Sequence, residues 1–164
     1  LPTRRRNMGI VFQAYSLFPH LDAIDNVAYG LKIKGRNKID RRNRAGELLE
    51  LVGLSEHTTK FPGQMSGGQQ QCVAIARAIA THRDILFADE PTGALDSESR
   101  REVMDNLVTL PEVGTTLVMV THDPVVASQT QRVIFLYDGH IVDDTTGLSS
   151  REISDRLVQM EVHA

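Results

Sequence analysis

Ile85-Leu86-Phe87-Ala88-Asp89-Glu90-Pro91-Thr92 is the stretch on which the interpretation of the whole sequence depends. Its first four residues are continuously apolar, which is typical of a β-strand covered on both faces in a parallel sheet. The apolar run stops at two adjacent acids, Asp89 and Glu90. In open α/β sheets, ligands bind beyond the carboxyl ends of the strands. The stretch therefore predicts a buried strand that delivers two carboxylates to a ligand site.

Two further apolar runs end in polar residues in the same way. Residues 8–12 are followed by Gln13, and residues 116–120 are followed by Thr121 and His122. Both runs are expected to be buried strands, so three strand ends would bring polar side chains to one edge of a sheet. A further buried strand is expected at 133–136, with a hairpin turn at Asp138-Gly139 and a return arm at 140–142.

Amphipathic helices alternate with these strands, which indicates the α/β class with a mostly parallel sheet. Residues 14–80 are mostly helical and lie between two of the expected strands, so we predict a helical subdomain inserted into the core. Residues 1–13 and 81–164 would form the rest of that core. The expected helices lie at about 22–35, 40–52, 66–80, 97–110 and 149–160, with a short one from 124.

The composition bounds the class of protein. The 164 residues carry 18 basic and 21 acidic side chains, a formal charge of −3, which argues against a broad nucleic-acid footprint. No apolar run approaches the roughly 18 residues of a membrane-spanning helix, and no secretory signal is visible. The single cysteine, Cys72, excludes an internal disulfide and is typical of a reducing cytoplasm.

The acid pair suits a division of labour. Asp89 could hold Mg²⁺ together with waters and phosphate oxygens, while Glu90 could orient or deprotonate a water. The alternative is that the two acids merely cap the following turn. The other strand-end candidate is His122, which is either a functional imidazole or a capping or internally satisfied side chain.

The helix expected from Ser66 begins with two glycines, Gly67 and Gly68. Glycines at a helix start leave backbone N–H groups bare and allow a ligand to approach, and the helix dipole favours an anion there. The alternative is an ordinary serine N-cap with a flexible entry.

Five motifs resemble those of the ATP-binding-cassette (ABC) ATPases and stand in the same order. Phe12-Gln13 resembles the Q-loop, residues 65–78 resemble the signature sequence, and residues 85–92 resemble the Walker B strand with its catalytic glutamate. Residues 94–96 resemble the D-loop, and residues 121–123 resemble the H-loop. Residues 89–96 also resemble the subgroup that serves lipoprotein-release and macrolide-export transporters. The resemblance implies a P-loop NTPase (RecA-like) fold.

The resemblance also implies a function: a subunit that hydrolyses ATP to drive transport through a transmembrane permease, located at the cytoplasmic face of the cell membrane. Two such cassettes enclose two ATP molecules, each between the P-loop of one chain and the signature of the other. Nucleic acid is not an expected partner.

The resemblance assigns roles to individual residues. Glu90 would be the general base and His122 would contact the γ-phosphate, while Asp89 and Gln13 would face Mg²⁺. Asp96 would couple the two sites of the dimer. The remaining residues implied to bind ATP are Ser66, Gly67, Gly68, Gln69 and Gln70, together with Gln13 and Asp96.

Two departures from the family pattern matter. The sequence contains no G-x-x-x-x-G-K-[ST], the segment that cradles the β- and γ-phosphates. Cys72 stands where the family commonly has Arg. We therefore expect residues 1–164 to be a single incomplete nucleotide-binding domain, truncated at its N-terminus, that hydrolyses ATP poorly or not at all and exposes the strand at 117–120.

Two alternatives remain open at this point. One is a non-catalytic partner that presents only its signature half-site to an intact ABC subunit. The other is an ABC ATPase of DNA repair or chromosome structure, which is disfavoured because only 53 positions separate Gln13 from Ser66, leaving no room for a long coiled coil.

Overall fold

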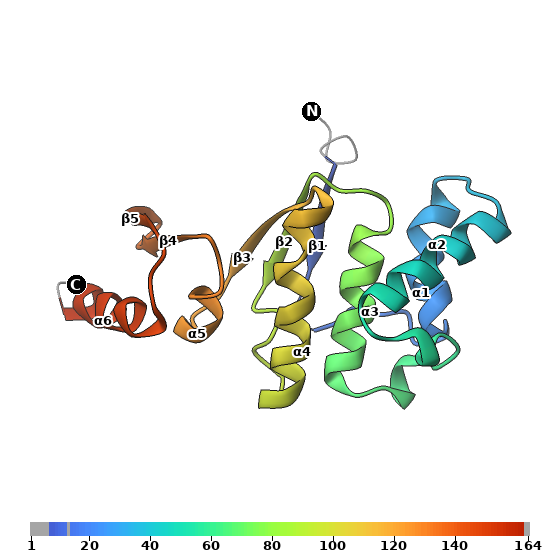
Figure 1. The fold of residues 1–164 in the computed structure, drawn as a ribbon, viewed down its shortest axis with the longest axis horizontal. Helices are drawn as coiled ribbons and strands as arrows, with labels where there is room; N and C mark the ends of the chain where they lie inside the picture. Colours follow the sequence, from blue (N-terminus) through green and yellow to red (C-terminus); the bar gives the residue numbers. More distant parts are fainter. Residues whose placement is uncertain (1–6, 13, 163–164) are drawn as a thin grey trace. The chain divides into compact units, whose positions relative to one another are not determined.

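The computed structural model describes residues 7–12 and 14–162 (Figure 1). The chain divides into two compact units, Leu1–Val120 and Thr121–Ala164, called here the first and second unit. Each unit is described by itself. The assignment of residues 1–164 to one incomplete domain, with a helical subdomain over 14–80, stays a prediction.

A parallel sheet of three strands lies at the centre of the first unit. Its order is β1 (Met8–Val11), β2 (Ile85–Asp89) and β3 (Thr116–Val120). Val11 lies opposite Ala88, and Asp89 lies opposite Val120. Because all three strands run in the same direction, their carboxyl ends meet at one edge of the sheet. The predicted parallel α/β sheet is confirmed.

The expectation that all three strands are buried is wrong in part for the two outer strands. In β2, Leu86 and Ala88 are almost completely buried, but Ile10 in β1 and Val120 in β3 are each 55% exposed. The physical reason is that helices α3 and α4 lie over one face of the sheet (Figure 1), and β3 forms one edge of it. An unbroken apolar run therefore does not by itself indicate that both faces of a strand are buried.

Four α-helices lie among the described residues of the first unit, and their starts follow the capping residues. Asp22 caps α1, because its Oδ1 accepts a hydrogen bond from the Asp25 backbone at 2.8 Å. The second helix begins earlier than predicted, because Asn37 is its cap and accepts from the Asp40 backbone at 2.9 Å. The helices are α1 (Ala23–Ile33), α2 (Lys38–Leu51), α3 (Gly67–Ile79) and α4 (Ser97–Val108).

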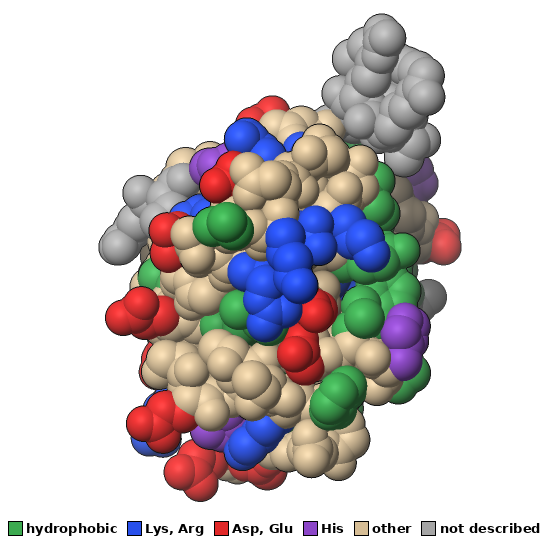
Figure 2. Space-filling view, turned by 90° about the vertical axis from the view of Figure 1, so that its right-hand side faces the viewer, with side chains coloured by type: hydrophobic (Ala, Val, Ile, Leu, Met, Phe, Trp, Pro, Cys, Tyr) green, Lys and Arg blue, Asp and Glu red, His purple; other side chains and the backbone are tan. Residues whose placement is uncertain are grey.

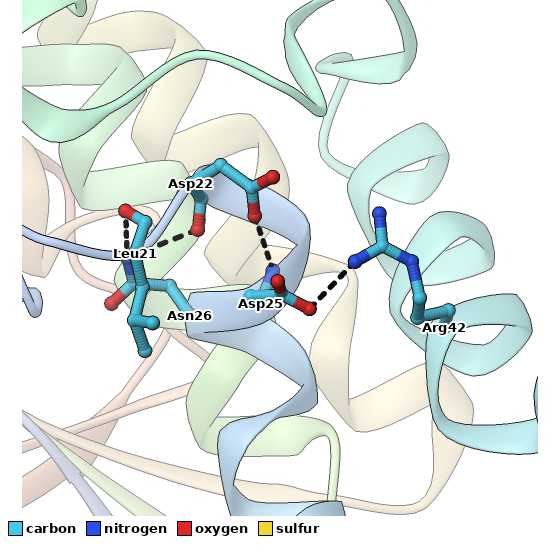
Figure 3. A network of polar contacts seen from close by, with 5 residues as sticks. All are labelled: Leu21, Asp22, Asp25, Asn26 and Arg42. Carbon is cyan, nitrogen blue, oxygen red and sulfur yellow. Dashed lines mark hydrogen bonds and ion pairs between the residues drawn. The ribbon is translucent and has the colours of Figure 1, made fainter. Parts of the chain in front are cut away.

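The loop that follows β1 is tied to α1 by a buried asparagine (Figure 3). The side-chain amide of Asn26 donates to the carbonyl oxygens of Leu21 at 3.0 Å and Phe18 at 3.1 Å, and its Oδ1 accepts from the Phe18 backbone at 2.9 Å. An ion pair of 2.7 Å between Arg42 and Asp25 joins α2 to α1. These contacts fix the loop between the sheet and the helical segment.

The second unit contains a hairpin and two helices. The elements are α5 (Pro124–Ala127), β4 (Arg132–Tyr137), β5 (His140–Thr146) and α6 (Ser150–Val162). The predicted turn is confirmed: Asp138 and Gly139 both have positive φ, as a type I′ turn requires. Glu152 and Ser149 form a capping box before α6.

The prediction of a buried strand at 133–136 is wrong in its burial. Phe135 is buried, with the Arg156 guanidinium 5.8 Å from its ring centroid, but Ile134 and Leu136 are exposed. The reason is that β4 pairs with β5 in a two-stranded sheet, so alternate side chains point away from it. The return arm also extends beyond residue 142, to Thr146.

Candidate functional site

The acid pair sits where β2 ends. Asp89 is exposed at the end of the strand, and Glu90 begins a turn with a φ of +43°. The Glu90 backbone N–H donates to the Val120 carbonyl at 2.9 Å, and the Glu90 carbonyl accepts from Gly93 at 3.1 Å. Left-handed backbone is uncommon outside glycine and costs energy, and it is found preferentially at functional sites. The sheet and the turn together hold Glu90 in this conformation.

The start of α3 is a closed capping box. Ser66 Oγ accepts from the Gln69 backbone at 3.2 Å, and Gln69 Oε1 accepts from the Ser66 backbone at 3.1 Å. Gln70 donates to the Met65 carbonyl at 3.1 Å. The alternative of a serine N-cap is therefore correct for the local structure. Ser66 itself remains exposed at the positive end of the helix dipole, and its role towards ATP stays a prediction.

The two glycines of this helix start lie very close to neighbouring segments. A Cβ at Gly67 would lie 2.6 Å from the Tyr15 hydroxyl and 3.2 Å from Leu95. A Cβ at Gly68 would lie 2.8 Å from the Cβ of Ser99 in α4. Contacts under 3.0 Å are not tolerated without movement, so glycine lets α3 approach the segment 95–99 closely. Sequence reasoning attributed these glycines to the approach of a ligand and missed this internal reason.

Asp96 caps α4 beside this contact. Its Oδ1 accepts from the backbone of Ser99 at 3.0 Å and of Glu98 at 3.1 Å. Hydrogen bonds from Ser99, first from its backbone and then from its side chain, lower the pKa of Asp96 below its ordinary value. Ser99 also faces Gly68, so one residue joins the end of the predicted D-loop to the start of the signature helix.

Gln71 connects three of the predicted motifs, and sequence reasoning did not single it out. It is fully buried, and its amide nitrogen donates to the Pro91 carbonyl at 2.9 Å and lies 3.5 Å from the Phe12 carbonyl. Pro91 directly follows Glu90, and Phe12 directly precedes Gln13. The sequence did contain a signal for the burial of Gln71. It stands four and eight residues before the buried Ile75 and Ile79, so all three lie on the same face of the helix.

Three further residues singled out from the sequence are Gln13, His122 and Cys72. Gln13 lies outside the described residues. His122 is exposed and belongs to the second unit, next to Asp123, whose Oδ1 accepts from the Val125 backbone at 2.8 Å and caps α5. Cys72 is fully buried, with the Asn106 amide 3.6 Å from its sulfur. Burial raises the pKa of Cys72 to about 12, with a further contribution from Glu102.

The next feature is the set of side chains that could hold Mg²⁺. Among residues 7–12 and 14–162 no group of three or more His, Cys, Asp or Glu side chains could hold a metal ion. Asp89 nevertheless offers an exposed carboxylate at the sheet edge, and Mg²⁺ is commonly held by one or two carboxylates with substrate phosphates and waters. The residues therefore fit Mg²⁺ that arrives with a nucleotide. Across the same residues, no helix is long and apolar enough to cross a membrane.

The parallel sheet, the acid pair at its edge and the capped signature helix define the class as a P-loop NTPase fold of the ATP-binding-cassette type. The sequence model described as ABC transporter matches residues 1–93, more than half of the chain. The chain belongs to the ABC transporter family.

Curated relatives are macrolide exporters by name. The chain is 48% identical over 158 residues to the macrolide export ATP-binding/permease protein MacB of Chromobacterium violaceum. The matched region covers 96% of this chain and 24% of that protein. It is 49% identical over 151 residues to MacB of Photorhabdus laumondii, covering 92% and 23%. The chain therefore spans about a quarter of the length of these relatives.

Solved cassettes share the fold. The dimeric post-hydrolysis structure of the ATP-binding cassette MJ0796, bound to ADP and Pi, matches with a TM-score of 0.75 and 42% identity, over 89% of this chain and 65% of that one. A second dimeric structure of MJ0796, a bacterial ABC transporter cassette, matches with the same TM-score and 43% identity, with the same coverage.

Proposed function

We propose that the chain acts as the ATP-hydrolysing cassette of an ABC transporter, in which Glu90 is the general base. The observation that carries this proposal is the turn after β2. It fixes Glu90 in left-handed backbone at the carboxyl edge of a parallel sheet, directly after an exposed aspartate. Ligands of open α/β sheets bind at this edge, and an acid that is positioned there can orient or deprotonate an attacking water.

The other residues supply position and charge. Asp89 would hold Mg²⁺, which neutralises developing phosphate charge when it is bound. Ser66 and the N-terminal amides of α3 would bind the γ-phosphate of ATP held by a second cassette, because the helix dipole and unpaired N–H groups favour an anion. His122 would contact a γ-phosphate, and Gln13 would face Mg²⁺ or the attacking water.

The partners of this function are a second cassette and a membrane permease. Support comes from what the similar proteins are called: the curated relatives are ATP-binding/permease proteins, and the solved cassette is dimeric and bound to ADP and Pi. The chain would then work at the inner face of the cell membrane. Export of a macrolide is the transport activity that the relatives' names suggest for the protein.

We also propose that these 164 residues alone hydrolyse ATP poorly or not at all. They contain no Gly-Lys-Ser or Gly-Lys-Thr, so they carry no P-loop lysine and amide cradle to hold the β- and γ-phosphates against Glu90. The second candidate function follows from the same observation. The capped start of α3 could complete the ATP site of an intact cassette without any catalysis by Glu90.

A chimera separates the two candidates. The P-loop segment of a macrolide-export relative is joined ahead of residue 1, and steady-state ATP turnover is measured with Mg²⁺. We expect turnover in the chimera and none above buffer in the 164-residue chain. Replacing Glu90→Gln in the chimera should lower kcat by about 10²–10⁴-fold, the usual contribution of a general base. Turnover by the 164-residue chain alone at the rate of the chimera would contradict the proposed loss of activity, and a Glu90→Gln chimera with unchanged kcat would remove Glu90 from the mechanism.

A complementation assay tests the second candidate. An intact cassette whose own signature serine is disabled is mixed with the 164-residue chain. If the chain offers its signature half-site, ATP turnover by the intact cassette should rise and should disappear with Ser66→Arg. Here Glu90→Gln should have no effect. A silent chimera together with successful complementation would favour the non-catalytic partner over the ATPase.

A further inference from the structure

The positive charge of this chain is concentrated in one short segment. Residues 32–44 carry seven of the 18 basic side chains and only one of the 21 acidic ones, a net charge of +6 in a chain whose total is −3. We call this segment the basic tip. It comprises the end of α1, the turn at 34–37 and the start of α2.

The basic tip points outward from the first unit. All nine residues from Lys32 to Asp40 are exposed. Figure 2 shows the side of the molecule on which α1 and α2 lie, and Lys and Arg side chains gather near its centre. The single acid of the tip, Asp40, accepts a hydrogen bond of 2.6 Å from the side chain of Asn37 at the helix cap.

The cations of the basic tip differ in whether they form ion pairs or hydrogen bonds within the molecule. Arg42 and Arg44 form ion pairs with Asp25 and Glu47, and Lys34 donates to the Thr81 carbonyl at 2.9 Å. No ion pair to another described residue is formed by the remaining four, which are Lys32, Arg36, Lys38 and Arg41. Three of these four, Arg36, Lys38 and Arg41, have no stabilising partner of this kind among the described residues, whereas Lys32 stands in the last turn of α1, where a cation complements the helix dipole.

The start of α2 also carries positive charge where it opposes helix formation. Lys38 is the first residue of the helix and Arg41 is the fourth, at the end where the helix dipole disfavours cations. Two large apolar side chains stand beside them, because Ile33 is 72% and Ile39 is 73% exposed. Unpaired cations at an unfavourable helix end and adjacent exposed isoleucines together indicate a surface that binds something anionic and partly apolar.

We propose that the basic tip binds the surface of an anionic phospholipid bilayer, with the four unpaired cations facing lipid phosphates and Ile33 and Ile39 at the boundary of the acyl chains. Clusters of Lys and Arg are attracted to anionic leaflets, and interfacial helices combine such cations with apolar side chains. The interaction needs neither ATP binding nor ATP hydrolysis, so it stands apart from the proposed catalytic function.

Other anionic partners fit the tip less well. The segment 32–44 contains no aromatic side chain on which a nucleic-acid base could stack. An acidic protein segment would satisfy the cations but would not use the exposed Ile33 and Ile39. A bilayer interface offers both phosphate charge and an apolar layer within reach of one surface.

Vesicle cosedimentation of the 164-residue chain tests the proposal. The chain should bind vesicles of phosphatidylcholine that contain phosphatidylglycerol, bind pure phosphatidylcholine only weakly, and dissociate as salt is raised. Each cation near an anionic surface strengthens binding by about fivefold, so the double variant Arg36→Gln/Lys38→Gln should bind about 25-fold more weakly. The matched control is Arg101→Gln/Arg151→Gln, which removes two exposed charges outside the tip and should bind as the parent does.

The apolar part has its own variant. Ile39→Ser should weaken vesicle binding without changing the effect of salt. Circular dichroism during heating checks that each variant remains folded, which is expected because the substituted side chains are exposed. Equal weakening by the control pair, or equal binding to neutral vesicles, would overturn the proposal. Unchanged vesicle binding in Ile39→Ser, together with displacement by polyglutamate, would overturn it in favour of an acidic protein partner.

Discussion

At the scale of single residues, small contacts set the geometry around the acid pair. Gly68 allows α3 to meet Ser99, and Gln71 reaches the turn that follows Glu90. Neither residue needs to touch a nucleotide for its replacement to matter. Gln71 holds the signature helix against the turn that carries the proposed general base, and Gly68 lets the same helix pack against α4.

The two glycines Gly68 and Gly46 give opposite predictions. Gly68→Ala should lower the free energy of unfolding by about 1–3 kcal/mol, because the new methyl group would press on Ser99 of α4. Gly46 lies inside α2 with nothing within 4 Å of an added Cβ, so Gly46→Ala should raise stability by about 0.5–1 kcal/mol. Urea unfolding followed by circular dichroism measures both. Equal effects of the two substitutions would show that the close approach at Gly68 is not a constraint.

Replacing Gln71 should loosen the turn after β2. Gln71→Met keeps the length of the side chain but leaves the buried Pro91 carbonyl without its 2.9 Å hydrogen bond, a loss of about 1–3 kcal/mol. Hydrogen exchange of the Gly93 and Leu95 amides, which close this turn, should become faster. Gln70→Met is the control, because the Gln70 side chain donates to the Met65 carbonyl within its own segment and not to the turn. Protection of the turn amides that survives in Gln71→Met would contradict the role of Gln71.

At the scale of elements, the contact between α3 and α4 is the best-defined packing interface near the site. Cys72 is buried in it beside Asn106, and Asp96 caps α4 next to the start of α3. The reactivity of Cys72 and the titration of Asp96 therefore give two separate tests of this interface.

Cys72 should be almost unreactive in the folded chain. Its burial and its pKa of about 12 keep the thiol neutral at ordinary pH, and only the thiolate attacks alkylating reagents. We expect iodoacetamide labelling at pH 8 to become fast only when denaturant separates α3 from α4. Rapid labelling without denaturant, on a chain that circular dichroism shows to be folded, would contradict the packing described here.

The cap at Asp96 should make stability depend on acidity. Its pKa is lowered in the folded chain, so its contribution is present above the ordinary value of 3.8 and is lost as pH falls through the lower folded value. Asp96→Asn keeps a capping side chain but cannot titrate. The difference in unfolding midpoint between the parent and Asp96→Asn should therefore shrink or reverse between pH 7 and about pH 3. A difference that stays constant with pH would rule out this linkage.

At the scale of the whole molecule, the edge of the sheet is the feature with the largest consequence. β3 is apolar from Leu117 to Val120 and forms one edge of the three-stranded sheet, and Val118 and Val120 are exposed. Exposed apolar edge strands can pair with other chains. The exposure that was expected at 117–120 is therefore found at alternate side chains of β3, namely Val118 and Val120.

The 164-residue chain should therefore associate with itself as its concentration rises. Val118→Lys places a charge on the edge strand and should suppress the association that light scattering detects. Val108→Lys makes the same chemical change on the exposed surface of α4 and should leave the association unchanged. Equal suppression by both substitutions would point to net charge rather than to the strand edge.

Much of this fold was accessible from sequence because its signals are local. Asp22, Ser66 and the pair Ser149 and Glu152 mark helix starts by hydrogen bonds within four residues, and Asp138-Gly139 marks a hairpin by its own backbone preference. The predicted start of α2 was wrong because Asn37 and Asp40 are both residue types that cap helices. In the structure, the Asp40 backbone donates to the Asn37 side chain, so Asn37 is the cap.

The sequence by itself determined the order of strands and helices, the α/β class and the family, because strand apolarity, capping residues and motif order are all properties of neighbours in the chain. Only the tertiary structure decided which faces of the strands are buried, how closely Gly67 and Gly68 approach their neighbours, and how Gln71 reaches Pro91. These depend on segments up to 59 residues apart meeting in space, as Gln71 and Phe12 do. Local pattern carries no information about such distances, whereas packing fixes them.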